Sequence, residues 1–529
     1  MTADHVCGSC GTALRANAKF CDECGAPARR AADTAQYKQV TVLFADVVRS
    51  MDIAAAVGAE RMREIMTDLV GRGAAVIARY GGTMEQFTGD GLMALFGAPT
   101  ALEDHAVRAC LAALELQAEA GHVATEVKRR DNLSLRLRVG LNSGRVVAGD
   151  MGSGITGYAA IGETVGYAQR MESVAPHGGV MLSEATARLV EHIATLNDVE
   201  MVRIKGADQP VPVRQLVAIG PRDGPPKRAE TDLVGRRWEM AALEAIVERA
   251  IANSGGVVNV AGPAGIGKSR VAREAAALAA NRGVDVVWAF CESHARDVPF
   301  HAVTRLLRAG LGVEDLDDET ARHRLRDTVP PETDQQDLLL LDDLLGVADP
   351  TTPLPRIDPE TRHRRLTALI NTTSLRRSTP ILYIIEDAHW IDAVSEAMLI
   401  DLLTVVRRTP TMVMITSRPE YEGALTRVRG AQTIGLAPLT DSDITALVED
   451  MVGADASVEE LTKLITDRAD GNPFFAGEIV RELAQRGVLS GDPGRYVCRT
   501  NVSEIDVPAT VQAAIEARID GLAPTAKHT

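Results

Sequence analysis

Residues 41–50, Thr41-Val42-Leu43-Phe44-Ala45-Asp46-Val47-Val48-Arg49-Ser50, place one carboxylate inside a run of apolar and β-branched residues. Such a run predicts a buried β-strand. An unpaired carboxylate is costly in a buried strand, and a cation is the simplest partner for Asp46. This stretch therefore predicts a strand that presents an acidic group to a metal ion.

A second acidic residue follows in Gly89-Asp90-Gly91, between two strand-like runs. An Asp-Gly pair in this setting is typical of a hairpin turn. Taken alone, Asp90 is explained as a turn former. Together, Asp46 and Asp90 could hold two Mg²⁺ or Mn²⁺ ions, which clamp the attacking and leaving oxygens of a phosphoryl-type displacement.

The order of the flanking patterns predicts the fold class. A strand at 40–44 precedes helical patterns across 53–79, the Asp90 hairpin and a helix near 103–129, and a strand at 134–140 and a glycine-rich loop at 144–154 follow. Helices packed on a mostly antiparallel sheet form an α+β domain.

Five motifs occur in the order found in class III nucleotide cyclases, which the segment 36–216 resembles. They are Phe44-x-Asp46, Phe87-Thr88-Gly89-Asp90-Gly91, Val139-Gly140-Leu141-Asn142-Ser143-Gly144, Val147-Ala148-Gly149-Asp150-Met151-Gly152, and Tyr158 through Arg170. The resemblance implies a ferredoxin-like cyclase fold and attack of the ribose 3′-oxygen of a nucleoside triphosphate on its α-phosphate, which releases pyrophosphate.

The same resemblance implies the roles of individual residues. Asp46, Val47 and Asp90 match the site of the two metals, and Arg170 matches the arginine that steadies the pentavalent phosphate. Family sites lie across a dimer interface, so a symmetric homodimer is expected.

Three substrate-binding positions depart from the family pattern. Gln86 replaces a lysine that reads adenine, Ala159 replaces an aspartate or threonine, and Gly166 replaces the asparagine that orients the ribose. Losing one preorganised donor typically costs roughly 2.7–4 kcal/mol, or about 10²–10³ in rate. Two interpretations therefore stay open: an adenylate cyclase of low activity, and a catalytically degenerate, dimerising nucleotide sensor.

Residues 1–28 contain two Cys-x-x-Cys pairs, formed by Cys7, Cys10, Cys21 and Cys24. A glycine directly follows the second cysteine of each pair, which allows two tight turns to aim four thiolates at one metal. The spacing therefore predicts a zinc ribbon with a structural Zn²⁺. The alternative is a pair of disulfides, which an intracellular setting disfavours.

A second unit begins with the strand-like run 257–261 and continues as Gly262-Pro263-Ala264-Gly265-Ile266-Gly267-Lys268-Ser269. This is the phosphate-binding loop in its strand-loop-helix context. Its glycines let backbone N–H groups surround phosphates, Lys268 supplies a positive charge, and the Ser269 hydroxyl can bind Mg²⁺. The sequence therefore predicts ATP with Mg²⁺ as the ligand.

Further motifs resemble the STAND signalling ATPases, relatives of the AAA ATPases. An apolar strand at 381–385, expected beside the strand of the phosphate loop, ends in Glu386 and Asp387, and the sequence leaves open which acid binds Mg²⁺. Arg418 ends the next strand and could sense the γ-phosphate, and the resemblance places Pro473 near the adenine. His389 is interpreted as a structural or coupling residue.

The whole chain of 529 residues is long enough for several domains. We expect a zinc ribbon at 1–28, a cyclase domain at 36–216, a linker at 217–230, an α/β P-loop ATPase at 231–490, and the start of a winged-helix or helical segment at 491–529 that is truncated. The helix pattern from 507 to 522 belongs to this last segment.

Composition and charge narrow the function class. The net charge of −15 and the lack of a basic recognition helix disfavour nucleic-acid binding and a transcription factor. No apolar run reaches membrane-spanning length, and the N-terminus lacks a basic region followed by an apolar stretch, which predicts a cytoplasmic protein. The two family resemblances imply a role in signalling.

Overall fold

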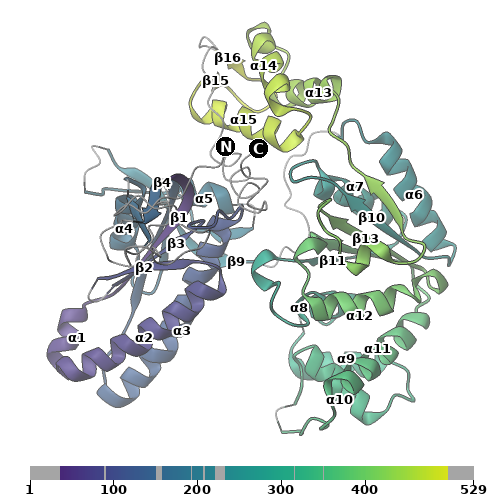
Figure 1. Ribbon diagram of the computed structural model, residues 1–529, viewed down its shortest axis with the longest axis horizontal. Coiled ribbons are helices and arrows are strands. Elements are labelled where there is room, and N and C mark those ends of the chain that lie inside the picture. Colours follow the sequence, from purple (N-terminus) through teal and green to yellow (C-terminus); the bar gives the residue numbers. More distant parts are fainter. Residues whose placement is uncertain are drawn as a thin grey trace, which may run out of the picture. The chain divides into compact units, whose positions relative to one another are not determined.

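The computed structural model describes residues 36–88, 91–150, 158–161, 163–191, 193–205, 209–220, 233–314, 316–349 and 351–498. The chain divides into two compact units, whose described parts are residues 36–220 (unit 1) and 233–498 (unit 2) (Figure 1). The four N-terminal cysteines and the predicted helix at 507–522 lie outside the described residues. No helix in the described ranges is long and apolar enough to cross a membrane.

Unit 1 is an α+β domain built on one mixed sheet. Its elements are β1 (Gln36–Val47), α1 (Ser50–Val57), α2 (Ala59–Arg79), β2 (Thr83–Thr88), β3 (Gly91–Phe96), α3 (His105–Asp131), β4 (Leu137–Asp150), β5 (Tyr158–Ile161), α4 (Glu163–Val174), β6 (Val180–Ser183), α5 (Glu184–Val190), β7 (Ala194–Leu196), β8 (Glu200–Val202) and β9 (Val211–Ile219).

The strands of unit 1 run in the order β2-β3-β1-β4-β6-β9-β7, with β5 paired to β4 and β8 paired to β9. The pairs are antiparallel except β4 with β6, which is parallel. The first four strands and their helices form the βαββαβ pattern of ferredoxin-like folds. The predicted α+β class is confirmed.

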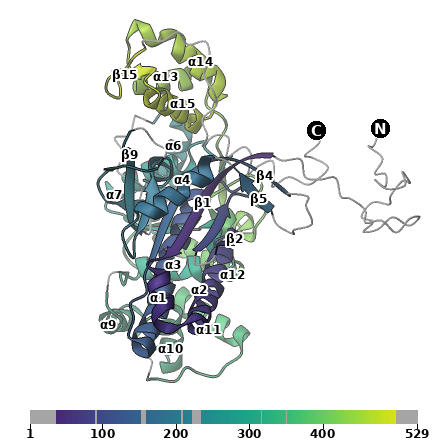
Figure 2. The same cartoon turned by 90° about the vertical axis from the view of Figure 1, so that its left-hand side faces the viewer.

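Strand β1 is apolar on both faces because helices cover both of its faces. Leu43 packs with Ile77 of α2 and Leu116 of α3, whereas Val42 on the other face packs with Ala168 of α4. Figure 2 shows α4 lying along β1. Burial on both faces explains why the sequence around Asp46 is a continuous apolar run rather than an alternating one.

The predicted glycine-rich loop at 144–154 is wrong over its first half, because β4 continues to Asp150 and pairs with β1 along its length. The glycines of this strand mark close contacts instead of a turn. A Cβ at Gly140 would overlap the backbone of Met171 and Glu172 in α4, and one at Gly144 would meet the side chain of Thr164. Residues 151–157 lie outside the described residues.

A buried polar chain joins β1 to its neighbours in unit 1. The Thr41 hydroxyl lies 2.7 Å from His105 Nδ1 and 2.7 Å from the Ser143 hydroxyl, which lies 3.0 Å from that of Thr186. The His105 side chain is 2% exposed. Burial lowers the pKa of His105 from 6.5 to about 4, against a smaller opposing effect of Asp104.

This lowered pKa predicts a pH-dependent stability of unit 1. The unfolded chain binds a proton at His105 below pH 6.5, while the native state does so only near pH 4. The contribution of the neutral His105 ring to the free energy of unfolding is therefore fully present above pH 6.5, and it is lost as the pH falls toward 4. Between about pH 7.5 and about pH 5, the advantage of the wild type over His105→Gln should shrink by about 2 kcal/mol.

The measurement is native-state hydrogen exchange of the α3 amides, with each opening free energy corrected for the intrinsic exchange rate at that pH. His122, which is exposed on the same helix, provides the control variant His122→Gln. An advantage over His105→Gln that stays constant with pH would show that the native ring titrates normally.

Unit 2 is an α/β domain with a C-terminal helical part. Its elements are α6 (Arg237–Ile251), β10 (Gly256–Ala261), α7 (Lys268–Ala280), β11 (Asp285–Phe290), η1 (Ser293–Ala295), α8 (His301–Gly310), α9 (Asp318–Thr328), α10 (Gln335–Leu344), α11 (Pro359–Leu375), β12 (Ile381–Glu386), η2 (Ala388–Trp390), α12 (Ala393–Leu403), η3 (Val406–Arg408), β13 (Thr411–Ser417), η4 (Ala424–Arg427), β14 (Gln432–Gly435), α13 (Asp441–Val452), η5 (Ala456–Val458), α14 (Glu459–Ala469), α15 (Pro473–Gln485), β15 (Leu489–Ser490) and β16 (Val497–Cys498), where η marks a 3₁₀ helix.

The five strands of the main sheet are parallel, in the order β11-β12-β13-β10-β14. Helices α6 and α7 cover one face, and α8 and α12 cover the other (Figure 1). The expectation that the strand ending in Glu386 lies beside the strand of the phosphate loop is wrong. Strand β13 pairs with both β10 and β12 and so separates them, and the ends of all three meet at the carboxyl edge of the sheet, where α/β proteins bind ligands.

Candidate active sites of the two units

In unit 1, Asp46 lies near the end of β1, opposite the β2–β3 hairpin. Its backbone pairs with Gly91 on one side and with Arg138 on the other. Asp90 precedes Gly91 directly and lies outside the described residues. The strand register therefore brings the residue that follows Asp90 into line with Asp46, as the two-acid hypothesis requires.

The Asp46 carboxylate is bound by Arg138, a residue that the sequence reasoning missed. The Arg138 guanidinium lies 3.3 Å from Asp46 Oδ2 and 2.9 Å from Glu172 Oε1 on α4. Arg138 belongs to an alternating Leu-Arg-Leu-Arg segment, which is typical of an ordinary half-exposed strand. Only the pairing of β4 with β1 shows that this arginine faces the acid.

A divalent cation fits this place because of its donor chemistry. Asp46 offers hard carboxylate oxygens, which Mg²⁺ and Mn²⁺ prefer, and Arg138 shows that the carboxylate already takes a positive partner here. Val47 is buried, so only its backbone could face a ligand. Within the described residues there is no group of three or more His, Cys, Asp or Glu side chains arranged for a metal ion.

Helix α4 carries Gly166 and Arg170 four residues apart, and thus on one face. Both residues are half-buried. A Cβ added at Gly166 would meet no atom within 4 Å, so the space for a side chain exists at this position. Helix α4 packs closely on Gly140 of β4 through the backbone of Met171 and Glu172, and this contact fixes the height of the helix above the sheet.

The two remaining substrate positions of unit 1 lie in strands. Gln86 is in β2, where its backbone pairs with Met93, and Ala159 is in β5, opposite Gly149. The side chains of Gln86 and Ala159 lie outside the described part of the chain, so their substrate-binding roles stay predictions.

In unit 2, the segment between β10 and α7 forms a loop shaped by its glycines. Gly265 and Gly267 have φ of +76° and +102°, values that favour glycine, and a Cβ at Gly262 would collide with Ile266. Lys268 is buried, and its Nζ donates hydrogen bonds to the carbonyl oxygens of Gly262 at 2.9 Å and Pro263 at 3.0 Å. Ser269 follows it in the first turn of α7.

The start of α15 is hydrogen-bonded to the same loop. Asn472 Nδ2 donates to the Ala264 carbonyl at 3.0 Å, and the Phe474 N–H donates to the Gly265 carbonyl at 3.3 Å. Pro473 lies between them as the first residue of the helix, with Asn472 as its N-cap. A helical element more than 200 residues away in the sequence is therefore built onto the phosphate loop.

Arg236 makes a second connection that the sequence reasoning missed. Its buried guanidinium donates to the carbonyl oxygens of Ile266 at 3.2 Å and Ala437 at 2.8 Å. It also pairs with Glu239 at 3.1 Å. The phosphate loop is thus tied to the segment that leads into α13. An arginine just before a helix gives no distinctive signal in the sequence.

The acids and the arginine of unit 2 lie at the ends of β12 and β13. Glu386 is 2% exposed, and Asp387 has a φ of +54°, which is uncommon for a residue other than glycine and is often found at functional sites. The Asp387 N–H donates to the Thr416 hydroxyl at 2.9 Å. Arg418 lies over the ring of Trp390, 5.9 Å from its centroid.

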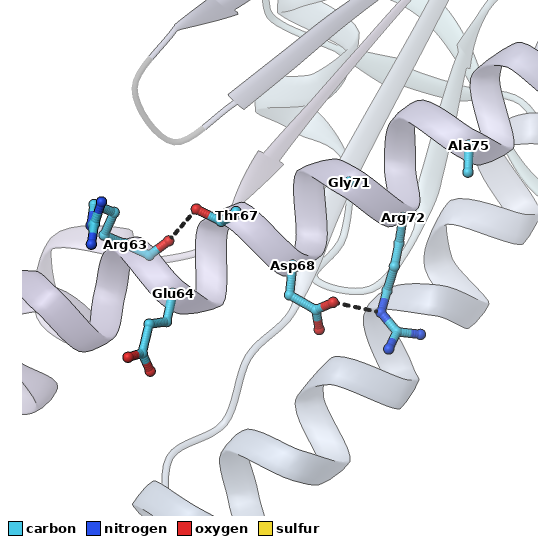
Figure 3. A pocket seen from close by; sticks show the side chains of 7 residues that line it. All are labelled: Arg63, Glu64, Thr67, Asp68, Gly71, Arg72 and Ala75. Atoms are coloured by element: carbon cyan, nitrogen blue, oxygen red, sulfur yellow. Dashed lines mark hydrogen bonds and ion pairs between the residues drawn. The ribbon is translucent and has the colours of Figure 1, made fainter.

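A surface pocket lies apart from these residues, along α2 of unit 1 (Figure 3). Its charged lining is largely self-paired, since Asp68 pairs with Arg72, which also pairs with Glu119. None of the predicted site residues lines it, so we assign it no part in either site.

Four family profiles match the chain. They are a zinc-ribbon domain at 6–28, an adenylate and guanylate cyclase catalytic domain at 32–214, an AAA ATPase domain at 232–415, and a domain of unknown function at 440–491.

Similar proteins cover different parts of the chain. An uncharacterized protein of Rhizobium meliloti is 26% identical over 91% of this chain and 47% of its own length. Adenylate cyclase 1 of the same organism is 26% identical over 34% of this chain and 28% of its length. Among solved structures, the adenylyl cyclase CyaB of P. aeruginosa is 26% identical over 36% of this chain and 98% of that chain, with a TM-score of 0.34. The chain thus spans about half or less of the length of these two relatives.

The profile matches agree with the α+β sheet of unit 1 and the parallel sheet of unit 2. They also confirm the expected order of domains along the sequence. The chain therefore joins a zinc ribbon, an adenylate and guanylate cyclase catalytic domain and an AAA ATPase domain, in that order, in one multidomain protein.

Proposed function

We propose that residues 36–216 convert ATP to cyclic AMP and pyrophosphate at a low rate, and that residues 231–490 bind ATP with Mg²⁺ and act as a regulatory switch in a cytoplasmic signalling protein. One observation carries the cyclase half of this proposal. The register of β1 with β3 aligns Asp46 with Gly91, the neighbour of Asp90 in the sequence.

In this proposal the site residues of unit 1 bind metal ions, orient a carboxylate and stabilise charge on the substrate. Asp46, Val47 and Asp90 hold two Mg²⁺ or Mn²⁺ ions, which supply charge neutralisation and Lewis acidity at the phosphates when bound. Arg138 orients the Asp46 carboxylate through its contact at 3.3 Å. Arg170, from the second chain of a homodimer, steadies the charge on the α-phosphate. Gly166 supplies no donor to the ribose, which limits the rate.

The ATPase half follows from the contacts of the phosphate loop. Lys268 and the loop amides bind phosphates, Ser269 and one of Glu386 and Asp387 bind Mg²⁺, and Arg418 approaches the terminal phosphate. Asn472 and Arg236 tie the loop to α15 and to the segment before α13. Nucleotide bound to this loop would therefore change the packing of α13–α15, which is how the switch would act.

Removal of one metal-binding acid tests the cyclase half. Full-length protein with Mn²⁺ and ATP should make cyclic AMP slowly, and Asp46→Ala should lower product to background because the site loses a carboxylate ligand. The measurement is cyclic AMP and cyclic GMP formed from ATP and GTP in parallel, with more product expected from ATP.

The matched control is Asp68→Ala, an aspartate of the same unit that pairs with Arg72 on the surface of α2 (Figure 3). It should leave the rate unchanged. A wild type that forms no cyclic nucleotide from either substrate, or a rate that survives Asp46→Ala, contradicts the proposal.

A further inference from the structure

His389 lies in η2, directly after the acidic end of β12. Its ring packs against Trp390, with the two centroids 5.0 Å apart, and Trp390 in turn lies under Arg418. Because β13 separates β12 from β10, His389 lies two strands away from the phosphate loop, on the far side of the strand that ends at Arg418. The functions assigned above do not use this side chain.

The hydrogen-bonding groups of His389 are unusual. Both ring nitrogens are buried, and neither has a hydrogen-bond partner among the described residues. Buried polar groups are normally paired, because an unsatisfied donor or acceptor destabilises the native state. With both nitrogens unpaired, the ring has its full hydrogen-bonding capacity left for a ligand bound at this edge of the sheet.

The charges around His389 indicate the kind of partner. Arg418 brings a guanidinium close to this cluster, because it lies over the Trp390 ring against which His389 packs. A neutral imidazole carries one N–H donor and one acceptor nitrogen. An unpaired N–H donor close to a guanidinium suits an anion that carries acceptor oxygens, and a phosphate group has both properties.

We infer that the unpaired N–H of His389 binds the terminal phosphate of a nucleoside triphosphate held by the phosphate loop. This inference rests on the proposed binding of ATP by unit 2. The loop amides and Lys268 take the phosphates nearest α7. His389 follows β12 and lies beyond Arg418 at the end of β13, on the side of the sheet away from the loop, so it contacts only the last phosphate of the row. The residue thus distinguishes a triphosphate from a diphosphate.

The experiment compares two nucleotides on full-length protein that carries Asp46→Ala to silence the cyclase site. Titration calorimetry with AMP-PNP, a triphosphate that is not hydrolysed, and with ADP gives both dissociation constants. His389→Ala should weaken AMP-PNP binding about tenfold, as expected for one hydrogen bond to a charged group, and should leave ADP binding within about twofold.

Three further variants make the result decisive. His389→Gln retains an N–H donor and should restore most of the preference for AMP-PNP, whereas His323→Ala, an exposed histidine of α9, should change neither constant. Lys268→Ala should weaken binding of both nucleotides about 10²-fold or more. Equal weakening of both by His389→Ala, or no weakening, overturns the inference alone. Absence of binding to the Asp46→Ala parent overturns the proposed ATP site and the inference together.

Discussion

Gly166→Asn should raise the rate of cyclic nucleotide production by the full-length protein roughly 10²–10³-fold, the effect of one preorganised donor in an active site. The family resemblance puts an asparagine at this position, where its side chain orients the ribose. The structure has room for that side chain, since a Cβ at Gly166 meets no atom within 4 Å. Gly166 is helical with an ordinary φ, so the substitution also adds no backbone strain.

The rate is measured with Mn²⁺ and ATP, and kcat and KM are separated, because a donor used mainly in the transition state raises kcat. Gly121→Asn is the matched control. Gly121 is exposed on α3 and also has open space around its Cβ position, but it lies far along the sequence from any predicted site residue. A folded Gly166→Asn variant with the rate of the wild type would show that another group has taken over the role of the asparagine.

Lys268→Ala should weaken ATP binding by unit 2 about 10²-fold or more, because it removes a charge-assisted contact to the phosphates. The Nζ is well placed for this task. It is buried at the edge of the loop, where the Gly262 and Pro263 carbonyl oxygens hold it within 3.0 Å. Calorimetry of ATP binding in the Asp46→Ala background isolates this site from the cyclase site.

Lys463→Ala serves as the control for loss of a lysine, because Lys463 is exposed on α14 and pairs with Glu459 of the same helix. It should bind ATP like its parent. Thermal unfolding of Lys268→Ala would show whether the unit stays folded. Tight ATP binding by a folded Lys268→Ala variant would count against the assignment of the phosphate loop.

Features that depend on neighbouring residues could be predicted from the sequence. The run around Asp46 specifies a strand, and the glycines before Lys268 specify a loop, because backbone preferences act over a few residues. The same local logic failed at 144–154. There, a glycine that usually favours a turn lies within β4 instead, because a Cβ at Gly144 would meet the side chain of Thr164 in α4.

Contacts between distant segments could not be predicted in this way. Arg138 meets Asp46 across 92 positions, and Asn472 meets Ala264 across 208. Such pairs depend on which strands are neighbours and in which register, and the sequence pattern of one strand is compatible with several neighbours. The insertion of β13 between β10 and β12 is an example of this ambiguity.

The sequence by itself therefore determined the order of the domains, the fold classes and the chemistry available at Asp46, Lys268 and their motifs. Only the tertiary structure decided which groups meet: Arg138 with Asp46, the start of α15 with the phosphate loop, and Arg418 with the Trp390 ring beside His389. The physical reason is that local chain preferences fix elements and motifs, whereas burial of apolar faces brings remote elements together and so sets the partners of each polar group.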